Sequence, residues 1–346
     1  MRQVTVFNYN IPMAAGVVLR DRQVKSRQGL LVRLEEAGRE GWGEIAPLPG
    51  FSAETMPQAQ AEALRWLQRW RTGEETGRAL LASSLSPRLS GSLSSSSPLQ
   101  HHTPDLSPSV AFGLSCALAE LAGVLPSTGN YSGAMLCTGD PDELIAQLSQ
   151  LSQPVVKLKV GLYEAARDGI TASLLLEAVP TLMLRLDANQ QWSLEKARQF
   201  ARFVPASLRA RIAFIEEPCR TQQDSRLFAQ ETGIALAWDE SSRIPGYIPA
   251  AEPHLSTIVI KPMLVGSLVA VCETITRAGE AGLQAVISSS VESSLGLTQL
   301  ARIAHWLTPG VAPGLDTLSL MQQQLVRPWP GSPLPLLTCE SLAVTW

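Results

Sequence analysis

Five apolar runs of similar length follow one another in the second half of the chain: VVKLKVG (155–161), LMLRLDAN (182–189), IAFIEEP (212–218), IALAWDE (234–240) and STIVIKP (256–262). Glycine, proline or polar residues bound each run. Short apolar runs with such boundaries are typical of buried parallel strands. The sequence therefore predicts a set of parallel strands between residues 155 and 262.

One polar residue stands at the end of each run, and these residues are regularly spaced. The intervals are 28, 29, 23 and 22 residues, and the residues are Lys159, Asp187, Glu216, Asp239 and Lys261. Each interval has room for a strand, a helix and two loops, so the pattern predicts repeated βαβ units. Such units close into a barrel whose active site lies at the C-terminal strand ends. We therefore predict an α/β fold, a modified (β/α)8 TIM-like barrel of the (β/α)7β type, with these side chains converging at one end.

The length of 346 residues exceeds that of one barrel, so we expect a second, smaller domain. The beginning of the chain lacks the strand–helix rhythm, which predicts an α+β capping domain over 1–125. Within it, the Ser/Pro-rich stretch 82–108 predicts a surface insertion, because its composition cannot bury enough apolar surface to offset its ordering entropy. The barrel is expected over 126–318, and the segment 319–346 is expected to return to the cap.

Composition excludes several classes of protein. The net charge of −3 offers no basic surface for nucleic acid. No run reaches the roughly 18 apolar residues of a membrane span, and the N-terminus lacks the apolar segment of a signal peptide. The five cysteines are scattered without CxxC spacing, as in a reducing compartment. We therefore expect a cytoplasmic protein with no nucleic-acid or membrane partner.

Three of the strand-end residues are carboxylates on neighbouring strands. Asp187, Glu216 and Asp239 offer hard oxygen ligands, which suit Mg²⁺ or Mn²⁺ rather than zinc. Acids that merely face solvent at the strand ends are the alternative. Because side chains alternate along a strand, Glu217 is expected to point away from Glu216. The pattern favours a metal site in which only the first of these two glutamates takes part.

Lysines complete the set. Lys157 and Lys159 share one face of their strand, while their apolar neighbours face the helices. Lys261 ends a strand on the far side of the predicted barrel. Like-charge repulsion from a metal ion between the lysines would lower their pKa values and favour base function. Simple neutralisation of the carboxylates remains the alternative. Metal, carboxylates and lysines together indicate proton abstraction next to a substrate carboxylate.

The motifs KLKVG, RLDAN, FIEEPC, AWDES and VIKP, in this order, resemble the muconate-lactonizing subgroup of the enolase superfamily. Longer strings resemble the gamma-proteobacterial form of the o-succinylbenzoate synthase family, which serves menaquinone biosynthesis: GWGEIAPLPGFS (41–52), SVAFGLSCALAEL (109–121), KVGLYEAARDG (159–169) and ISSSVESSLGLTQLARIA (287–304). The resemblance covers nearly the whole chain outside 82–108. That long insertion departs from the family pattern.

The resemblance implies a lyase, specifically a hydro-lyase acting on a carbon–oxygen bond. The reaction would be a Mg²⁺-dependent syn dehydration of 2-succinyl-6-hydroxy-2,4-cyclohexadiene-1-carboxylate to 2-succinylbenzoate through an enolate. Lys159 would be the general base and then the general acid, and Lys261 would stabilise the enolate. The metal would be held by Asp187, Glu216 and Asp239, with Mn²⁺ a possible substitute.

Further roles follow from the same resemblance and from strand positions. Lys157 would tune Lys159. Ser288, Ser289 and Gly314, at the ends of the seventh and eighth strands, are expected to bind the succinyl group. Arg185 shares a face with Asp187 and is expected to touch substrate or buttress a ligand. The partner would be a small-molecule substrate, and the enzyme a monomer or weak homo-oligomer.

Two other functions stay open at this point. An N-acylamino acid racemase or dipeptide epimerase of the same superfamily would need both lysines as acid/base catalysts. A non-catalytic barrel used for binding would not need all five strand-end polar residues, yet all five are present.

Overall fold

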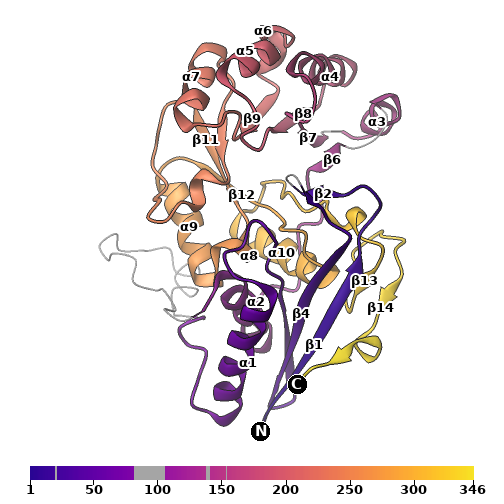
Figure 1. Cartoon of the computed structure of the whole chain (residues 1–346), viewed down its shortest axis with the longest axis vertical. Coiled ribbons are helices and arrows are strands. Elements are labelled where there is room, and N and C mark those ends of the chain that lie inside the picture. Colours follow the sequence, from indigo (N-terminus) through magenta and orange to yellow (C-terminus); the bar gives the residue numbers. More distant parts are fainter. Residues whose placement is uncertain (20–21, 82–105, 138–140, 153) are drawn as a thin grey trace.

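The computed structural model describes residues 1–19, 22–81, 106–137, 141–152 and 154–346. It contains a seven-stranded sheet surrounded by helices and a separate four-stranded sheet formed mainly from the N-terminal residues (Figure 1). Nearly all of the predicted insertion at 82–108 lies outside the described residues. No helix of the described chain is long and apolar enough to span a membrane.

The seven-stranded sheet is parallel and follows the order of the sequence without a crossover. Its strands are β6 (Met135–Cys137), β7 (Val155–Lys159), β8 (Met183–Asp187), β9 (Ile212–Glu216), β10 (Leu236–Trp238), β11 (Leu255–Ile260) and β12 (Gln284–Ile287). Five of them are the five apolar runs. The predicted α/β fold with a barrel of the enolase type is confirmed.

An irregular segment, rather than a full strand, closes the sheet on itself. Gly314 donates its backbone N–H to the carbonyl oxygen of Ile287, at the end of β12, over 2.8 Å. On the other side, Ala134, just before β6, donates to the carbonyl oxygen of Pro313 over 2.8 Å. The predicted eighth strand is therefore reduced to a single bridge between Ser288 and Gly314.

Helices cover the outside of the barrel (Figure 1). They are α3 (Pro141–Leu148), α4 (Ala165–Ala178), α5 (Leu194–Arg202), α6 (Ala206–Arg209), α7 (Gln222–Thr232), α8 (Pro262–Val265), α9 (Leu268–Glu280) and α10 (Ser294–Leu307). Hydroxyl side chains cap the N-termini of α5, α7 and α9: Ser193, Thr221 and Ser267 each accept a backbone N–H of the first turn. Between β10 and β11 the described chain forms only the short 3₁₀ helix η3 (Ser241–Arg243).

Strand alternation sorts the barrel side chains into two faces. Apolar residues such as Val156, Leu158 and Leu184 join the large core between sheet and helices. The inner face carries a separate small cluster: Phe214, Ala237, Val259 and Val286. Each member of this cluster lies two residues before a polar residue at the end of its strand (Glu216, Asp239, Lys261 or Ser288), so the cluster forms the layer directly below these residues.

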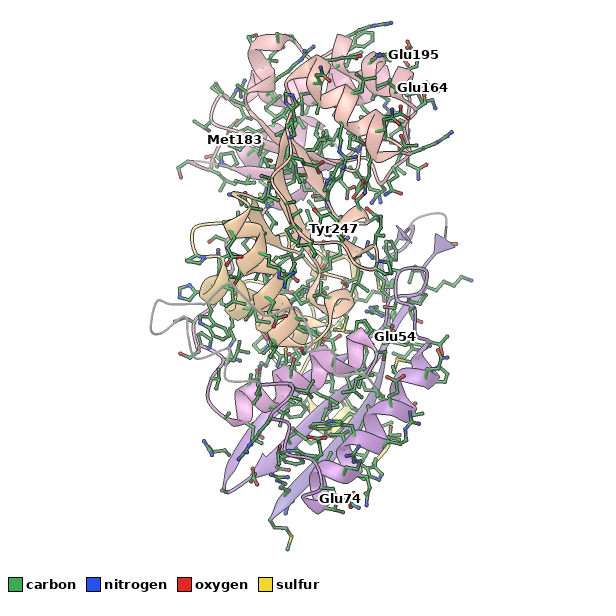
Figure 2. All side chains as sticks on the ribbon, turned by 90° about the vertical axis from the view of Figure 1, so that its left-hand side faces the viewer. Glu54, Glu74, Glu164, Met183, Glu195 and Tyr247 are labelled. Carbon is green, nitrogen blue, oxygen red and sulfur yellow. The ribbon has the colours of Figure 1, made fainter. Side chains whose placement is uncertain are left out.

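The second sheet is antiparallel and combines both ends of the chain. Its strands, in spatial order, are β15 (Ala343–Val344), β1 (Arg2–Pro12), β4 (Ser26–Glu36) and β5 (Arg39–Ile45). The helices α1 (Met56–Thr72) and α2 (Pro108–Leu121) pack on it. Short elements complete this part: β2 (Val18–Leu19), β3 (Arg22–Gln23), η4 (Leu318–Leu320), β13 (Gln324–Leu325), β14 (Leu336–Leu337) and η5 (Cys339–Ser341). Figure 2 shows the exposed Glu74 at this end of the molecule and the exposed Glu164 and Glu195 at the other.

Two buried charged side chains of the N-terminal sheet hold the segment after β12. Arg27 donates through Nε to the carbonyl oxygen of Val291 over 2.8 Å. Glu44 accepts the backbone N–H groups of Ser293 and Gly296 over 2.9 and 3.0 Å, which caps the start of α10. Val291 has a φ of 62°, a conformation that β-branched residues rarely adopt, so these contacts restrain an unfavourable backbone.

Glycines allow α2 to lie directly against β5. A Cβ at Gly43 would overlap the carbonyl oxygen of Gly113, and one at Gly41 would overlap that of Ala117. Both of these oxygens belong to the backbone of α2, which cannot move without shifting the whole helix. The close approach joins the N-terminal sheet to a helix that also contacts α8 of the barrel.

We predict that Gly43→Ala lowers the free energy of unfolding by about 1–3 kcal/mol or more, the usual cost of overpacking. Gly279→Ala is the matched control, because this exposed helical glycine has no atom within 4 Å of an added Cβ. It should be neutral or stabilise by roughly 0.5–1 kcal/mol, since alanine favours helices. Chemical denaturation of both variants measures the difference. Equal stabilities would show that α2 can move away from β5.

Candidate active site

A cavity of about 500 Å³ lies at the C-terminal ends of the barrel strands. Barrel residues line one side of it: Lys157, Lys159, Asp187, Asn189, Lys261, Ser288, Ser289 and Gly314. The N-terminal part of the chain lines the other, through residues 14–17, Leu48 and Phe51. The position matches the active-site end of a barrel.

The register of the strands brings the predicted residues together. Lys159 is the partner of Asp187 between β7 and β8, and Asp187 is the partner of Glu216 between β8 and β9. Ala237 of β10 pairs with Glu216, which places Asp239 just beyond it. All three carboxylates are buried, with exposed fractions of 7% for Asp187, 3% for Glu216 and 1% for Asp239.

Lys157 lies between two of these carboxylates. Its Nζ is 2.9 Å from Asp187 Oδ2 and 2.7 Å from Glu216 Oε2. Burial alone would lower the pKa of Lys157, but the two carboxylates outweigh it and raise that pKa above the ordinary lysine value. Lys157 is therefore a buried cation that neutralises the acids.

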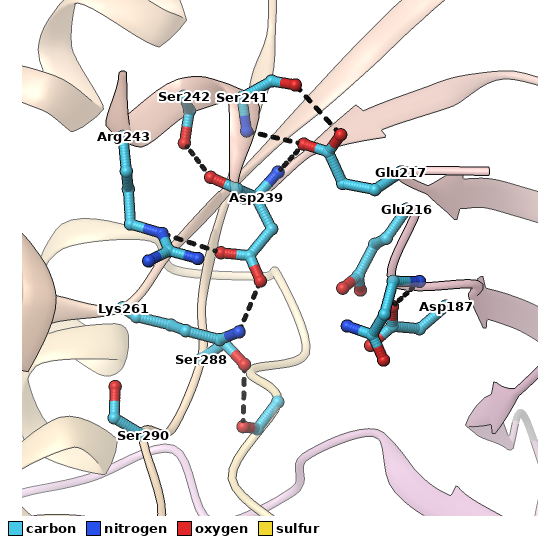
Figure 3. Close-up of polar contacts among 12 residues, drawn as sticks. Asp187, Glu216, Glu217, Asp239, Ser241, Ser242, Arg243, Lys261, Ser288 and Ser290 are labelled. Atoms are coloured by element: carbon cyan, nitrogen blue, oxygen red, sulfur yellow. Dashed lines mark hydrogen bonds and ion pairs between the residues drawn. The ribbon is translucent and has the colours of Figure 1, made fainter. Parts of the chain in front are cut away.

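Asp239 has two cationic neighbours. Lys261 donates to Asp239 Oδ2, and Arg243 Nε lies 3.3 Å from Asp239 Oδ1 (Figure 3). Burial acts to lower the pKa of Lys261, yet the contact with Asp239 raises it overall. Here too the neutralising role that the sequence left open is visible. Phe51 covers this lysine, with Nζ 5.9 Å from the centre of its ring.

The site is rich in negative charge despite these cations. Burial raises the pKa of Glu216 to about 7, and the charges of Asp187 and Asp239 add to this although Lys157 opposes it. Burial and the charge of Asp239 likewise raise the pKa of Glu240. An additional cation would therefore be stabilised here.

The donor set fits a hard divalent cation. The three acids supply only oxygen atoms, and the buried Oδ1 atom of Asn189 has no hydrogen-bond partner among the described residues. Asp239 Oδ1 has the ion pair with Arg243 but no hydrogen bond. No three acids, histidines or cysteines of the described chain are grouped around one point as a complete metal site. The lysine ammonium groups lie among the acids instead: Lys157 contacts Asp187 and Glu216, and Lys261 contacts Asp239.

The predicted succinyl-binding residues lie on the wall of the cavity. Ser288 Oγ is 3.3 Å from the carbonyl oxygen of Gly314, and Ser289 Oγ contacts both Glu292 and Thr317. These residues are next to each other because residue 314 bridges β12 at Ser288. Their hydroxyl groups are already partly engaged within the protein.

Arg185 does not line the cavity. Its guanidinium donates to the carbonyl oxygen of Ala312 over 2.8 Å and lies 5.2 Å from the ring centre of Phe214. It sits in the layer below Asp187, two residues earlier on β8. The expectation that Arg185 touches substrate is therefore not supported by its position, whereas the buttressing role fits.

Several cavity residues were not predicted from the sequence. Asn189 lies two residues after Asp187 in the RLDAN motif, so its position in the cavity could have been predicted from the sequence. Asp316 lines the cavity and accepts the backbone N–H of Leu136 over 2.8 Å, but no apolar run marks its segment. Residues 14–17 come from a distant loop, which spacing within the barrel cannot reveal.

Comparison with known proteins assigns the family. The family model described as "MenC, N-terminal domain" matches residues 1–94, and "Enolase C-terminal domain-like" matches residues 143–322. The o-succinylbenzoate synthase of Yersinia pseudotuberculosis serotype I (strain IP32953) is 56% identical over 347 residues, which cover 100% of this chain and 99% of that protein.

Solved structures share the fold at lower identity. The o-succinylbenzoate synthase of Thermosynechococcus elongatus BP-1, solved with Mg in its active site, superposes with a TM-score of 0.69 at 23% identity, over 93% of this chain and 94% of that one. The L-Ala-D/L-Glu epimerase of Bacillus subtilis gives a TM-score of 0.69 at 20% identity, over 93% and 91%. Identities this low speak for the fold alone. The full-length match to the Yersinia enzyme goes further, and the chain belongs to the o-succinylbenzoate synthase family, lyases of the enolase superfamily.

Proposed function

We propose that this enzyme dehydrates 2-succinyl-6-hydroxy-2,4-cyclohexadiene-1-carboxylate to 2-succinylbenzoate, a step of menaquinone biosynthesis. The observation that carries the proposal is the cavity lined by Lys159, Asp187 and Lys261, with the buried carboxylates Glu216 and Asp239 at the ends of the next two strands, in a chain of this family. The cavity of about 500 Å³ is large enough for a substituted six-membered ring.

The two lysines face each other across the barrel. Lys159 ends β7, whereas Lys261 follows β11, and three strands separate these two in the sheet. Lys159 makes no hydrogen bond or ion pair with another described residue, so its amine is available to the substrate. Lys261 is held by Asp239. We assign the proton transfers to Lys159 and a fixed electrostatic role to Lys261.

In this scheme Lys159 takes the proton from the carbon next to the ring carboxylate. The electron pair moves into the carboxylate as an enolate, whose charge Lys261 stabilises from the other face. Lys159 then returns the proton to the departing hydroxyl group on its own side, and water leaves. The product ring is aromatic, which drives the elimination. Lys157 keeps Asp187 and Glu216 in place below the reacting atoms.

Asp187, Glu216 and Asp239 are the residues that would hold Mg²⁺, with Mn²⁺ as a substitute. When bound, such an ion polarises a substrate carboxylate and neutralises the enolate charge. Ser288, Ser289 and Gly314 would contact the succinyl group from the opposite wall of the cavity. Arg185 would support Asp187 from below.

Residues 1–125 and 319–346 would act together as the cap of a barrel formed by 126–318. Phe51, Leu48 and residues 14–17 close the cavity from the cap side, which excludes water from the enolate. We also propose a cytoplasmic enzyme, monomeric or weakly homo-oligomeric, without a nucleic-acid partner. The net charge of −3 and the family's biosynthetic substrate support this.

We predict different effects for conservative changes of the two lysines. Lys159→Arg should lower kcat by at least the roughly 10²–10⁴-fold typical of lost acid–base catalysis, because a guanidinium cannot act as a base near neutral pH. Lys261→Arg keeps the positive charge and should retain measurable dehydration. Lys261→Ala should lose about 10²–10³-fold, as other preorganised groups do when removed. The absorbance of the aromatic product measures all three.

The ranking of the two arginine variants decides between mechanisms. A racemase or epimerase uses both lysines for proton transfer, so both arginine variants would then be equally inactive. If Lys261→Arg loses more dehydration activity than Lys159→Arg, the base has been assigned to the wrong face of the barrel. Arg198→Lys, at an exposed ion pair remote from the cavity, should match the wild type.

We predict that the metal-free enzyme is inactive and that Mg²⁺ restores it. Mg²⁺ at 100 times its dissociation constant should also stabilise the fold by about 2.7 kcal/mol. Glu216→Gln should lose most of this stabilisation, while Glu231→Gln, at an exposed ion pair, should keep it. Thermal melts with and without Mg²⁺ provide the measurement. Full activity after chelation would refute the assignment of the three carboxylates.

A further inference from the structure

Glu217 adopts an unusual conformation beside the three carboxylates. β9 ends at Glu216, and Glu217 has a φ of 42°, in the left-handed region that non-glycine residues rarely occupy. Simple alternation would have pointed its side chain to the far face of the sheet. The chain instead turns at this residue, and the side chain is only 1% exposed.

Each carboxylate oxygen of Glu217 accepts two hydrogen bonds. Oε1 accepts the backbone N–H groups of Asp239 and Ser241 over 3.0 and 2.8 Å. Oε2 accepts the Ser241 hydroxyl over 2.9 Å and the Gln190 side-chain amide over 3.1 Å. Figure 3 shows the contacts to Asp239 and Ser241. With both oxygens engaged, Glu217 is not itself a candidate metal ligand.

These contacts join the loops after three neighbouring strands. Gln190 lies three residues after Asp187, and its backbone N–H donates to the carbonyl oxygen of Glu217 over 2.8 Å. Asn189 and Gln190 also have positive φ values, of 43° and 61°. The loops after β8 and β9 can keep residues in the left-handed conformation because hydrogen bonds between Gln190 and Glu217 restrain both backbones. Glu217 thus ties together the ends of β8, β9 and β10, each of which carries one of the three acids.

We infer that Glu217 is a positioning residue for the metal centre: its carboxylate fixes the spacing of the strand ends that carry Asp187, Glu216 and Asp239. The inference rests on the metal site of the proposed function. Groups that orient metal ligands through hydrogen bonds commonly determine metal affinity. Here the restraint acts mainly through the backbone, since Glu217 binds the N–H of Asp239 itself.

A purely structural role is the competing explanation, and Glu252 provides the matched control. Glu252 accepts the indole N–H of Trp238, the residue just before Asp239, and pairs with Arg226 at 2.7 Å. It is a carboxylate attached to the same strand and lies later in the segment after β10, but its side chain bonds Trp238 and Arg226 rather than Gln190, Asp239 or Ser241. Its loss should therefore lower stability without moving the acids.

The test is Mn²⁺ binding to metal-free protein, followed by electron paramagnetic resonance of the free ion. We expect Glu217→Ala to weaken Mn²⁺ binding by about 10–100-fold, the usual effect of removing a group that orients ligands. Glu217→Gln should lose less, because its amide oxygen can still accept the N–H groups of Asp239 and Ser241. Glu252→Ala should bind Mn²⁺ as the wild type does, even if its melting temperature falls.

The double variant Gln190→Ala/Ser241→Ala keeps the carboxylate but removes both side-chain donors, and it also should weaken Mn²⁺ binding. It decides the matter if Glu217→Ala does not fold. The inference is overturned if Glu217→Ala binds Mn²⁺ as tightly as the wild type, or, where Glu217→Ala does not fold, if the double variant does. It is also overturned if Glu252→Ala loses as much Mn²⁺ affinity as Glu217→Ala. Absence of Mn²⁺ binding to the wild-type protein would instead overturn the proposed metal site, and the inference with it.

Discussion

The parallel register of β7, β8 and β9 is the constraint on which the site depends. It sets Lys159, Asp187 and Glu216 side by side at the end of the sheet. A slip of one residue would turn each of these side chains toward the apolar core between sheet and helices, where a buried charge is costly. The packed floor of Phe214, Ala237, Val259 and Val286 keeps the strands at this register, because its small and large side chains fill the barrel below the site.

Charge balance is the second condition for this arrangement. Three carboxylates buried at neighbouring strand ends would be prohibitively costly without cations, and Lys157, Lys261 and Arg243 each lie within 4 Å of one or two of them. Lys157 and Lys261, which allow the acids to be buried, therefore also line the cavity. Burial, with a contribution from the charges of Asp187 and Asp239, raises the pKa of Glu216 to about 7 although Lys157 opposes it. A family whose chemistry generates a doubly charged enolate needs this kind of electrostatic environment.

Much of this could be predicted from the sequence, because apolar runs mark the strands and their ends mark the cavity. Lys159, Asp187 and Lys261 all line it, as their spacing indicated. What escaped prediction depends on contacts between distant segments. The fold-back of Glu217 requires the loop after β10 as a partner, and the placement of Arg185 requires the carbonyl of Ala312. Gly314 was placed at an eighth strand, but the reduction of that strand to a single bridge could not be predicted, because it depends on the partners that residues 313 and 314 find in β12 and before β6.

The pairing of the two chain ends has a consequence for the order of folding. β1 meets β15 through the partners Phe7 and Val344, so the outermost strand of the N-terminal sheet is made after the whole barrel. Contacts between residues so far apart in sequence form late, because closing the intervening chain costs entropy before any contact repays it. The nascent chain must therefore hold β1 with an open edge throughout the synthesis of the barrel.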